Sequence, residues 1–318
     1  MYQFRPFYNS DPPLLTEIWN AQPRLRGLAQ PITTSQFEDG ILSKSYFDRQ
    51  GLIVATKEDR PVGFAHAGFG PADDGTSIDT EFGVTCMVVV RPEEQASNLG
   101  LELLAQSEAY LRNRGAKVLY GGGIRPLNPF YLGYYGGSEL PGILCSDVWR
   151  QELFRAAGYV EADSVLVMHC DLSNFRPPIN RQQLLLKRST QIAHNLNPAS
   201  SPWWTACTLG ILEPVRFDLV DKLKAGISYG HASFWTMEPI AQSWGVRAAG
   251  MIDLEVDSTQ RRRGMATCLL SESFRQIQLQ GFSLVEAQVM HNNEPAIGLY
   301  RKLGFIEVDQ GTVLRKQG

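Results

Sequence analysis

The chain has 318 residues, of which 43% are hydrophobic and 20% charged, so it can bury substantial cores and is not disordered by composition. Thirty Lys and Arg residues against thirty-three Asp and Glu residues give a formal net charge of −3. This balance lacks the basic excess of a dedicated nucleic-acid-binding protein. The length suits two domains of about 150 residues each, or one large domain.

The sequence also argues against a membrane span and against metal chemistry. The longest apolar run, 82–90, is strand-sized, whereas a spanning helix needs about 20 residues. An early arginine and prolines interrupt the amino-terminal segment where a signal peptide would be continuously apolar. The five cysteines are widely spaced, odd in number and form no CxxC pair. We therefore expect a cytoplasmic protein without a metal, a membrane contact or a nucleic-acid partner.

Apolar runs, helical spacing and glycine stops predict strands and helices throughout the chain. In the first half they predict strands at 2–6, 81–90, 118–121 and 159–170, a hairpin at 52–69, and helices at 14–20, 93–114 and 147–157. In the second half they predict strands at 203–212, 231–237, 248–256, 284–289 and 305–314, and helices at 215–224, 265–280 and 294–303. Each half is thus predicted to be an α+β (α/β) unit with a mixed, mostly antiparallel, twisted sheet flanked by helices.

The chain aligned with itself indicates a duplication. Segment 90–104 aligns without a gap with 256–270, and segment 153–163 aligns with 299–309. The second alignment needs a shorter shift, so the first half carries an insertion, which we place near 120–145.

The boundary between the two predicted domains falls in a stretch with two prolines, 174–183. We therefore predict two tandem domains, residues 1–173 and 184–318. The insertion is rich in Gly, Tyr and Pro, and two interpretations are open: it closes over the acceptor site of one half, or it packs between the halves.

A strand-to-helix junction in the second half combines a tight turn with positive charge. Gly264 leaves room where the backbone turns, and Ala266 keeps the first helical turn slim. The free N–H groups at the start of a helix favour an anion, and Arg261, Arg262 and Arg263 add positive charge. The junction is either a cradle for a phosphate or pyrophosphate, or a solvated basic turn that caps a helix.

The next strand-to-helix junction carries a second motif. Asn293 suits an N-cap and Pro295 suits the first turn of a helix, which Gly304 ends. Tyr300 lies on the apolar face of this helix, where it is either a core aromatic residue or a functional one.

Together the two motifs resemble the GNAT superfamily of acyl-CoA-dependent N-acetyltransferases. The matching residues are Arg261-x-x-Gly264-x-Ala266 and Asn293-x-x-Ala296-x-x-Leu299-Tyr300-x-x-x-Gly304-Phe305. The resemblance implies a coenzyme A site in the second half, with the pyrophosphate on the N–H groups of residues 262–266 and Asn293 beside the pantetheine arm. The residues it implies for the coenzyme are Val256, Arg261, Arg262, Arg263, Gly264, Met265, Ala266 and Asn293.

The resemblance also suggests catalytic roles. Tyr300 is expected near the thioester sulfur, where its phenol can protonate the departing thiolate. A backbone N–H near Val256 is expected to stabilise the oxyanion. Strand alternation places Asp253 and Glu255 on one face, and Glu255 is our candidate for the general base. The other candidates are His291, Glu238 and Glu286, or no dedicated base at all.

The first half resembles the family weakly. Asn98 stands in place of Gly264, although asparagine tolerates the left-handed conformation, and the carboxylates of Glu93 and Glu94 would repel a pyrophosphate. Further along, Phe154 stands in place of Tyr300 and has no proton to give, while Asp147 and Arg150 replace Asn293 and Ala296. We expect this half to be a structural or substrate-shaping copy.

The sequence therefore predicts an acyl-CoA-dependent N-acyltransferase, with acetyl-CoA as co-substrate, a small-molecule amine as acceptor and the second half as the catalytic one. The alternative is a non-catalytic acyl-CoA-binding or regulatory protein. A purely structural pair of domains fits the first half alone. We expect a monomer or a homodimer.

Overall fold

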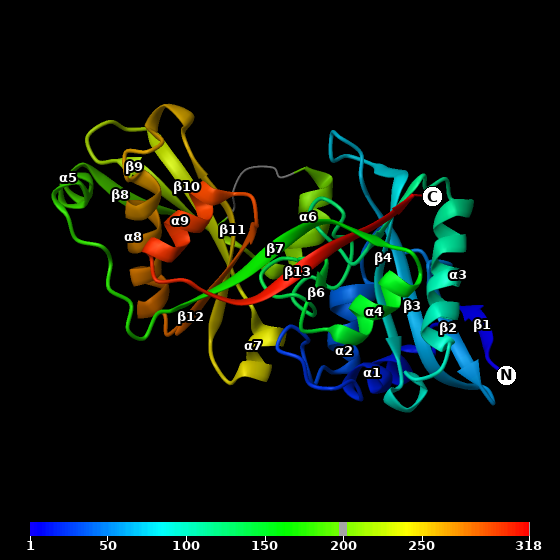
Figure 1. Cartoon of the computed structure of the whole chain (residues 1–318). Helices are drawn as coiled ribbons and strands as arrows, with labels where there is room; N and C mark the ends of the chain where they lie inside the picture. The colour runs from blue at the N-terminus through cyan, green and yellow to red at the C-terminus, as the bar shows by residue number, and fades with distance from the viewer. Residues whose placement is uncertain (197–201, 318) are drawn as a thin grey trace.

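The computed structural model describes residues 1–196 and 202–317, in which one long sheet runs through both halves of the chain (Figure 1). The strands of the first half are β1 (Gln3–Pro6), β2 (Leu52–Lys57), β3 (Arg60–Pro71), β4 (Ile78–Val90), β5 (Val118–Gly121), β6 (Ile143–Leu144) and β7 (Val160–Asp171). Those of the second half are β8 (Thr190–Asn195), β9 (Val215–Asp221), β10 (Ser228–Thr236), β11 (Ala248–Val256), β12 (Leu284–Met290) and β13 (Ile306–Gln317).

Helices flank this sheet in both halves (Figure 1). They are α1 (Pro12–Asn20), α2 (Thr34–Phe37), α3 (Leu99–Asn113), α4 (Val148–Ala156), α5 (Arg181–Ser189), α6 (Trp203–Leu209), α7 (Glu238–Trp244), α8 (Met265–Leu279) and α9 (Glu294–Lys302). Among the described residues, no helix is long and apolar enough to cross a membrane. The predicted fold class, two tandem units with mixed, mostly antiparallel sheets, is confirmed.

Two predicted elements of the second half are wrong. Residues 203–212, predicted as a strand, form α6 and a short 3-10 turn, because Trp204, Thr208 and Leu209 are buried at helical spacing. Residues 215–224, predicted as a helix, begin with the strand β9. Its buried positions, Phe217 and Leu219, alternate with polar ones, which is the period of a strand.

The two halves exchange their last strands. The sheet order is β1-β2-β3-β4-β5-β13-β7-β12-β11-β10-β9-β8. The final strand of the chain, β13, therefore pairs with β5 of the first half, while β7 pairs with β12 of the second half. Because each half completes its sheet with a strand from the other, the chain forms one structural unit.

The inserted segment fills the space between the halves. Tyr131 stacks on Trp19 with ring centroids 5.6 Å apart, and its hydroxyl lies 3.0 Å from Nδ1 of His66. The same buried cluster includes Trp235 and Ile252 of the second half. The middle of the insertion thus packs between the halves, as one of the two interpretations predicted.

The exchanged strands and the shared core predict that the whole chain unfolds in one cooperative transition. Val167→Ala, at a fully buried position of β7, should lower the stability by about 2 to 3 kcal/mol by removing methyl groups and leaving a cavity. The control Val160→Ala, on the same strand but 64% exposed, should change it by less than about 0.5 kcal/mol. Differential scanning calorimetry checks both. Two separate transitions, only one of them shifted by Val167→Ala, would contradict this prediction.

Candidate active site

A cleft opens where two parallel strands of the second half diverge. β11 and β12 pair only over Ala248–Met251 and Leu284–Ala287. Beyond these residues the strands separate, and a cleft of about 340 Å³ lies between them. Its lining comes from β11, β12, α9, β7 and the inserted segment. Residues far apart in the sequence therefore meet at one opening in the sheet.

A bulge in β11 shapes one wall of the cleft. Two residues, Asp253 and Leu254, lie opposite the single residue Ala232 of β10, and Asp253 has a φ of +53°. The extra residue interrupts the alternation along the strand. As a result, Asp253 lines the cleft, whereas Glu255 does not, so the expectation that both lie on one face is wrong.

The turn before α8 has the geometry of an anion cradle. Arg262 and Gly264 both adopt left-handed conformations, with φ of +60° and +75°. The carbonyl oxygen of Gly264 accepts the N–H of Cys268 at 3.0 Å and the side-chain amide of Gln183 at 3.1 Å, which fixes the turn. No described residue accepts a hydrogen bond from the N–H groups of residues 262–266. These groups and the start of the helix dipole can therefore bind an anion.

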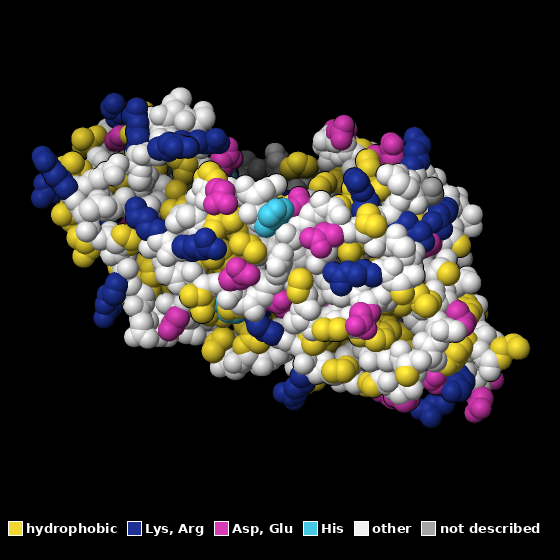
Figure 2. Space-filling view, in the orientation of Figure 1, with side chains coloured by type: hydrophobic (Ala, Val, Ile, Leu, Met, Phe, Trp, Pro, Cys, Tyr) yellow, Lys and Arg dark blue, Asp and Glu magenta, His cyan; other side chains and the backbone are white. Residues whose placement is uncertain are grey.

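Positive charge surrounds this cradle. Arg261, Arg262 and Arg263 are exposed, and Figure 2 shows Lys and Arg side chains gathered at the end of the molecule that α5, α8 and β9 form. Asp257 is the nearest carboxylate in the sequence, and it is engaged in capping the short turn that precedes the cradle, where it accepts the N–H of Thr259 at 2.8 Å. The cradle is thus suited to a polyanion such as a pyrophosphate.

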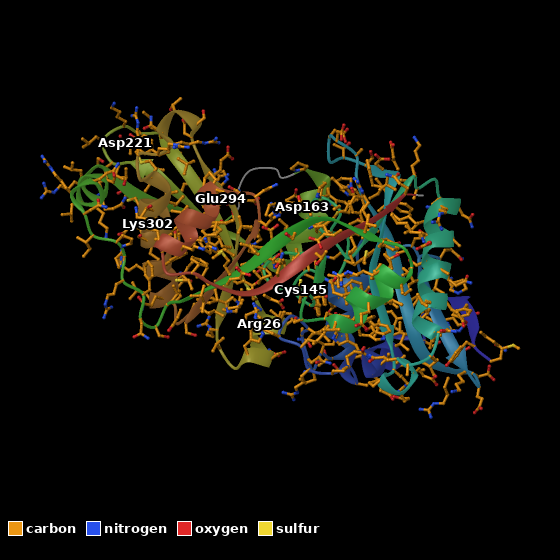
Figure 3. The ribbon with its side chains drawn as sticks, viewed as in Figure 1. Arg26, Cys145, Asp163, Asp221, Glu294 and Lys302 are labelled. Carbon is orange, nitrogen blue, oxygen red and sulfur yellow. The ribbon has the colours of Figure 1, made fainter. Side chains whose placement is uncertain are left out.

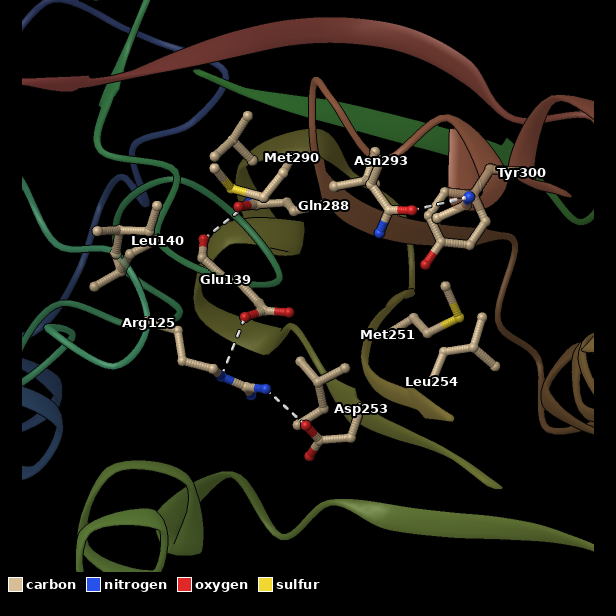
Figure 4. A pocket seen from close by; sticks show the side chains of 15 residues that line it. Arg125, Glu139, Leu140, Met251, Asp253, Leu254, Gln288, Met290, Asn293 and Tyr300 are labelled. Carbon is tan, nitrogen blue, oxygen red and sulfur yellow. Dashed lines mark hydrogen bonds and ion pairs between the residues drawn. The ribbon is translucent and has the colours of Figure 1, made fainter. Parts of the chain in front are cut away.

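Helix α9 brings two of the predicted residues to the cleft. Asn293 caps the helix by accepting the N–H of Ala296 at 3.3 Å, and the acidic Glu294 and basic Lys302, at its two ends in Figure 3, suit the helix dipole. Tyr300 is 6% exposed, and its hydroxyl points into the cleft (Figure 4). Burial, together with the negative charge of Glu139, raises the pKa of this phenol, so Tyr300 stays protonated.

The inserted segment supplies the opposite wall. Arg125 and Glu139 project from it toward Tyr300 and Asp253 (Figure 4). Nε of Arg125 lies 3.4 Å from the Glu139 carboxylate, and its Nη1 lies 2.6 Å from Asp253. Burial raises the pKa of Glu139, and the charge of Asp253 adds to this effect, while Arg125 opposes it.

Side chains of β12 hold this part of the insertion in place. Glu286, fully buried, accepts the N–H of Ser138 at 2.6 Å, and Gln288 donates to the carbonyl oxygen of Glu139 at 2.8 Å. Glu286 is itself bound by Arg26 at 3.1 Å and by His169 at 2.8 Å. Figure 3 shows Arg26 at the junction of the two halves. The loop that carries Glu139 is therefore anchored to the second half.

The remaining predicted residues lie outside the cleft lining. Glu255 is 69% exposed and 4.0 Å from His231, while Val256 pairs with Gly230 in the β-ladder. The three other residues considered as the base also lie outside this lining: His291 contacts Asp163, Glu238 begins α7, and Glu286 holds the inserted loop. The catalytic role of Glu255 and the oxyanion role of Val256 remain predictions.

Sequence reasoning missed Arg125 and Glu139. Neither belongs to a motif, and the insertion has no counterpart in the second half with which it could be aligned. The only indication was its Gly and Tyr content, which predicted a shaped loop without showing which of its charged residues faces a site.

The equivalent cleft of the first half is filled by side chains. Its parallel strands, β4 and β5, also part after a short pairing, at Thr85 and Gly121. Arg150, 2% exposed, occupies this space: its Nε donates to the carbonyl oxygen of Val88 at 2.8 Å, and its Nη1 donates to the Asp147 carboxylate at 2.5 Å. At the aligned position of the second half, Ala296 leaves the cleft open.

The start of α3 also lacks the cradle geometry. Asn98 has a φ of −74°, so the left-handed turn that asparagine could have preserved is absent. The indole of Trp149 donates to the carbonyl oxygen of Gln95 at 3.3 Å, and its ring packs against Gly100. Glu94 is bound by Lys57 and the hydroxyl of Tyr2. This corner is therefore closed by the protein itself.

Comparisons with known proteins identify relatives of this architecture. A sequence profile of the Acetyltransferase (GNAT) family matches residues 14–135 and 226–305, more than half of the chain. No curated protein matches the chain. Within residues 1–196 and 202–317, which the structure describes, no group of three or more His, Cys, Asp or Glu side chains could hold a metal ion.

Solved structures share the fold at low sequence identity. One is a GCN5-related glucosamine N-acetyltransferase region of a fungal multi-domain GH3 β-N-acetylglucosaminidase, with a TM-score of 0.73 and 16% identity; the match covers 99% of this chain and 38% of that protein. A GCN5-related N-acetyltransferase from Sphaerobacter thermophilus has a TM-score of 0.65 and 16% identity, covering 99% and 95%. A tandem GNAT protein from the clavulanic acid biosynthesis pathway has a TM-score of 0.65 and 14% identity, covering 100% and 98%.

The filled cleft of the first half predicts a large stability effect. Arg150→Ala leaves Asp147 buried without its cation and should cost about 3 to 5 kcal/mol, measured by urea unfolding at pH 7. Adding Asp147→Asn removes the unpaired charge and should recover part of this loss. The control Arg155→Ala, on the exposed face of the same helix, should cost less than about 0.5 kcal/mol. Equal losses of stability in Arg150→Ala and Arg155→Ala would show that the buried Arg150 side chain does not stabilise the first half.

Proposed function

The chain belongs to the GNAT family of acetyltransferases, and on this premise we propose that it transfers the acetyl group of acetyl-CoA to an amine of a small molecule in the cleft between β11 and β12. One contrast carries the proposal. Arg150 fills the cleft of the first half, whereas Ala296 leaves that of the second half open with the hydroxyl of Tyr300 facing into it. The second half is thus the catalytic one in this proposal.

The chain fits coenzyme A at this cleft. The N–H groups of residues 262–266 and the arginines beside them would bind the pyrophosphate. The pantetheine arm would pass Asn293 and Ala296 between the diverging strands, where β11 no longer pairs with β12. When bound there, acetyl-CoA supplies the activated acyl group.

Tyr300 is the proposed general acid. Its raised pKa keeps the proton on the phenol at neutral pH, so that it can protonate the sulfur as the C–S bond breaks. The same direction of shift means that Tyr300 is a poor base, which leaves deprotonation of the amine to another group.

A backbone N–H of β11 is the proposed oxyanion donor. Family resemblance suggests the N–H near Val256, and Leu254, in the bulge, is the last residue of β11 in the lining of the cleft. Donors fixed by a strand need no rearrangement as charge develops on the carbonyl oxygen, which is the condition for strong stabilisation.

The acceptor is proposed to be a small amine that is protonated in solution. Two carboxylates, Glu139 and Asp253, and one cation, Arg125, line the acceptor side, which leaves an excess of negative charge. Glucosamine, named for one of the structural relatives, is therefore the first acceptor to test. We also propose a cytoplasmic location, which the five free cysteines support.

Tyr300→Phe tests the proposal. Because the phenol supplies only a proton, this change should lower kcat by roughly 10²-fold and leave the Kd of acetyl-CoA nearly unchanged. Release of the free thiol, measured with glucosamine, ethanolamine and spermidine as acceptors, reports kcat, and calorimetry reports binding.

The control for this experiment is Tyr8→Phe, which removes an exposed hydroxyl far from the cleft and should not affect kcat. If wild-type protein binds acetyl-CoA but releases no thiol with any of the amines, a non-catalytic acyl-CoA-binding protein is the better assignment. A parallel loss of affinity in Tyr300→Phe would give this residue a binding or folding role instead.

A further inference from the structure

We propose that the first half of the chain completes the catalytic site of the second: Glu139, on the inserted segment, accepts the proton that the acceptor's ammonium group loses before its nitrogen attacks the thioester. This inference rests on the function proposed above and names the base and the charge state of the acceptor. The first half would then have lost its own coenzyme site while retaining a catalytic contribution.

The position of Glu139 is the first argument. Of the described acidic side chains, Glu139 and Asp253 line the cleft that holds Tyr300. Figure 4 shows Glu139 across the cleft from Tyr300, with open space between them. A quarter of the Glu139 side chain is exposed, so an amine entering the cleft can reach its carboxylate.

The carboxylates of Glu139 and Asp253 differ in how closely Arg125 binds them. Asp253 is 2.6 Å from Nη1 of Arg125 and is held firmly, whereas the Glu139 contact with Nε of the same guanidinium is longer, at 3.4 Å. A carboxylate in a weaker ion pair keeps a lone pair available for an incoming proton. Arg125 therefore satisfies Asp253 and orients Glu139.

The support of Glu139 is the second argument. Its own carbonyl oxygen accepts from Gln288 at 2.8 Å, and the preceding N–H, of Ser138, donates to the buried carboxylate of Glu286 at 2.6 Å. The turn before them needs glycine: Gly137 has a φ of +123°, and a Cβ there would lie 1.8 Å from Oε1 of Glu286. This anchoring fixes the carboxylate against the cleft, as a catalytic base requires.

The electrostatic surroundings of Glu139 favour its protonated form. The titratable and charged groups around Glu139 are Arg125 on its own segment, Asp253 on β11, Tyr300 on α9 and Glu286 on β12. Burial and the charge of Asp253 raise the pKa of Glu139 above its ordinary value, against the effect of Arg125. A carboxylate with a raised pKa holds a proton taken from an amine more tightly.

Glu139 and Tyr300 together account for every proton that moves in the proposed reaction. The ammonium gives one proton to the Glu139 carboxylate, and its nitrogen forms the C–N bond to the acyl carbon. The C–S bond breaks with its electron pair on sulfur, which takes the Tyr300 proton. The second nitrogen proton returns to the Tyr300 oxygen, and Glu139 releases its proton to water. The net products are an amide, a free thiol and one proton.

Glu139→Gln tests the inference, with two kinds of acceptor. With the panel amine that wild-type protein acetylates fastest, kcat/KM should fall by roughly 10² to 10⁴-fold, and the acidic limb of the pH profile should disappear. With hydroxylamine, which is uncharged at neutral pH, the loss should be less than about tenfold, because no proton must be removed first. The Kd of acetyl-CoA should not change.

Two matched variants complete this experiment. Glu255→Gln tests the base expected from the sequence, and the inference predicts no loss beyond about threefold. Glu152→Gln, an exposed residue of α4 in the first half, is the control for the substitution itself. A larger loss in Glu255→Gln than in Glu139→Gln, or equal losses of Glu139→Gln with both acceptors, would overturn the inference.

Melting temperatures give a readout that needs no substrate. Because the folded chain holds the Glu139 proton more tightly, wild-type stability should fall relative to Glu139→Gln as pH rises from about 4.3 through the raised pKa. A constant difference across this range would contradict the inference. Absence of turnover in wild-type protein that binds acetyl-CoA would refute the proposed function instead, whatever the melting curves show.

Discussion

Where two strands of a sheet separate, their facing backbone groups lose their partners, and a buried group without a partner is costly. This constraint applies twice in the chain, once between β4 and β5 and once between β11 and β12. In the first half, Arg150 provides the missing partner, because its side chain donates to the carbonyl oxygen of Val88. In the second half, the aligned Ala296 is too small to do so, and the cleft stays open; in the proposed function, the amides of the pantetheine arm pair with the strand there.

The exchange of β7 and β13 explains how a segment of the first half reaches the cleft of the second half. It places the end of the first half beside β12, so that Glu286 and Gln288 can bind the inserted segment across the boundary. The segment then has two uses: its aromatic middle fills the shared core, and its charged ends face the open cleft. The cleft of the second half thus depends on the first half, which contributes a strand to its sheet and one wall to its opening.

The sequence predicted the parts of this arrangement that are local. Turn glycines, the Asn293 cap and the spacing around Tyr300 indicated the strand-to-helix junctions, and the self-alignment indicated the duplication. The sequence could not predict the exchanged strands, because the periodicity of a strand shows which of its side chains are buried but not which other strand it pairs with. The bulge at Asp253 likewise shows no residue signal, so alternation placed Glu255 on the wrong face. The position of Glu139, on which its proposed role rests, depends on contacts between the halves, which no sequence motif records.

Titration calorimetry of coenzyme A tests the central claim most directly, because it counts the open clefts. Wild-type protein should bind one molecule per chain, and Ala296→Arg, which introduces into the second half the residue that fills the first, should bind none while retaining its melting transition. The control Ala105→Arg, on the exposed face of α3, should bind as wild type does. Two molecules bound per wild-type chain, or undiminished binding by Ala296→Arg, would contradict the account.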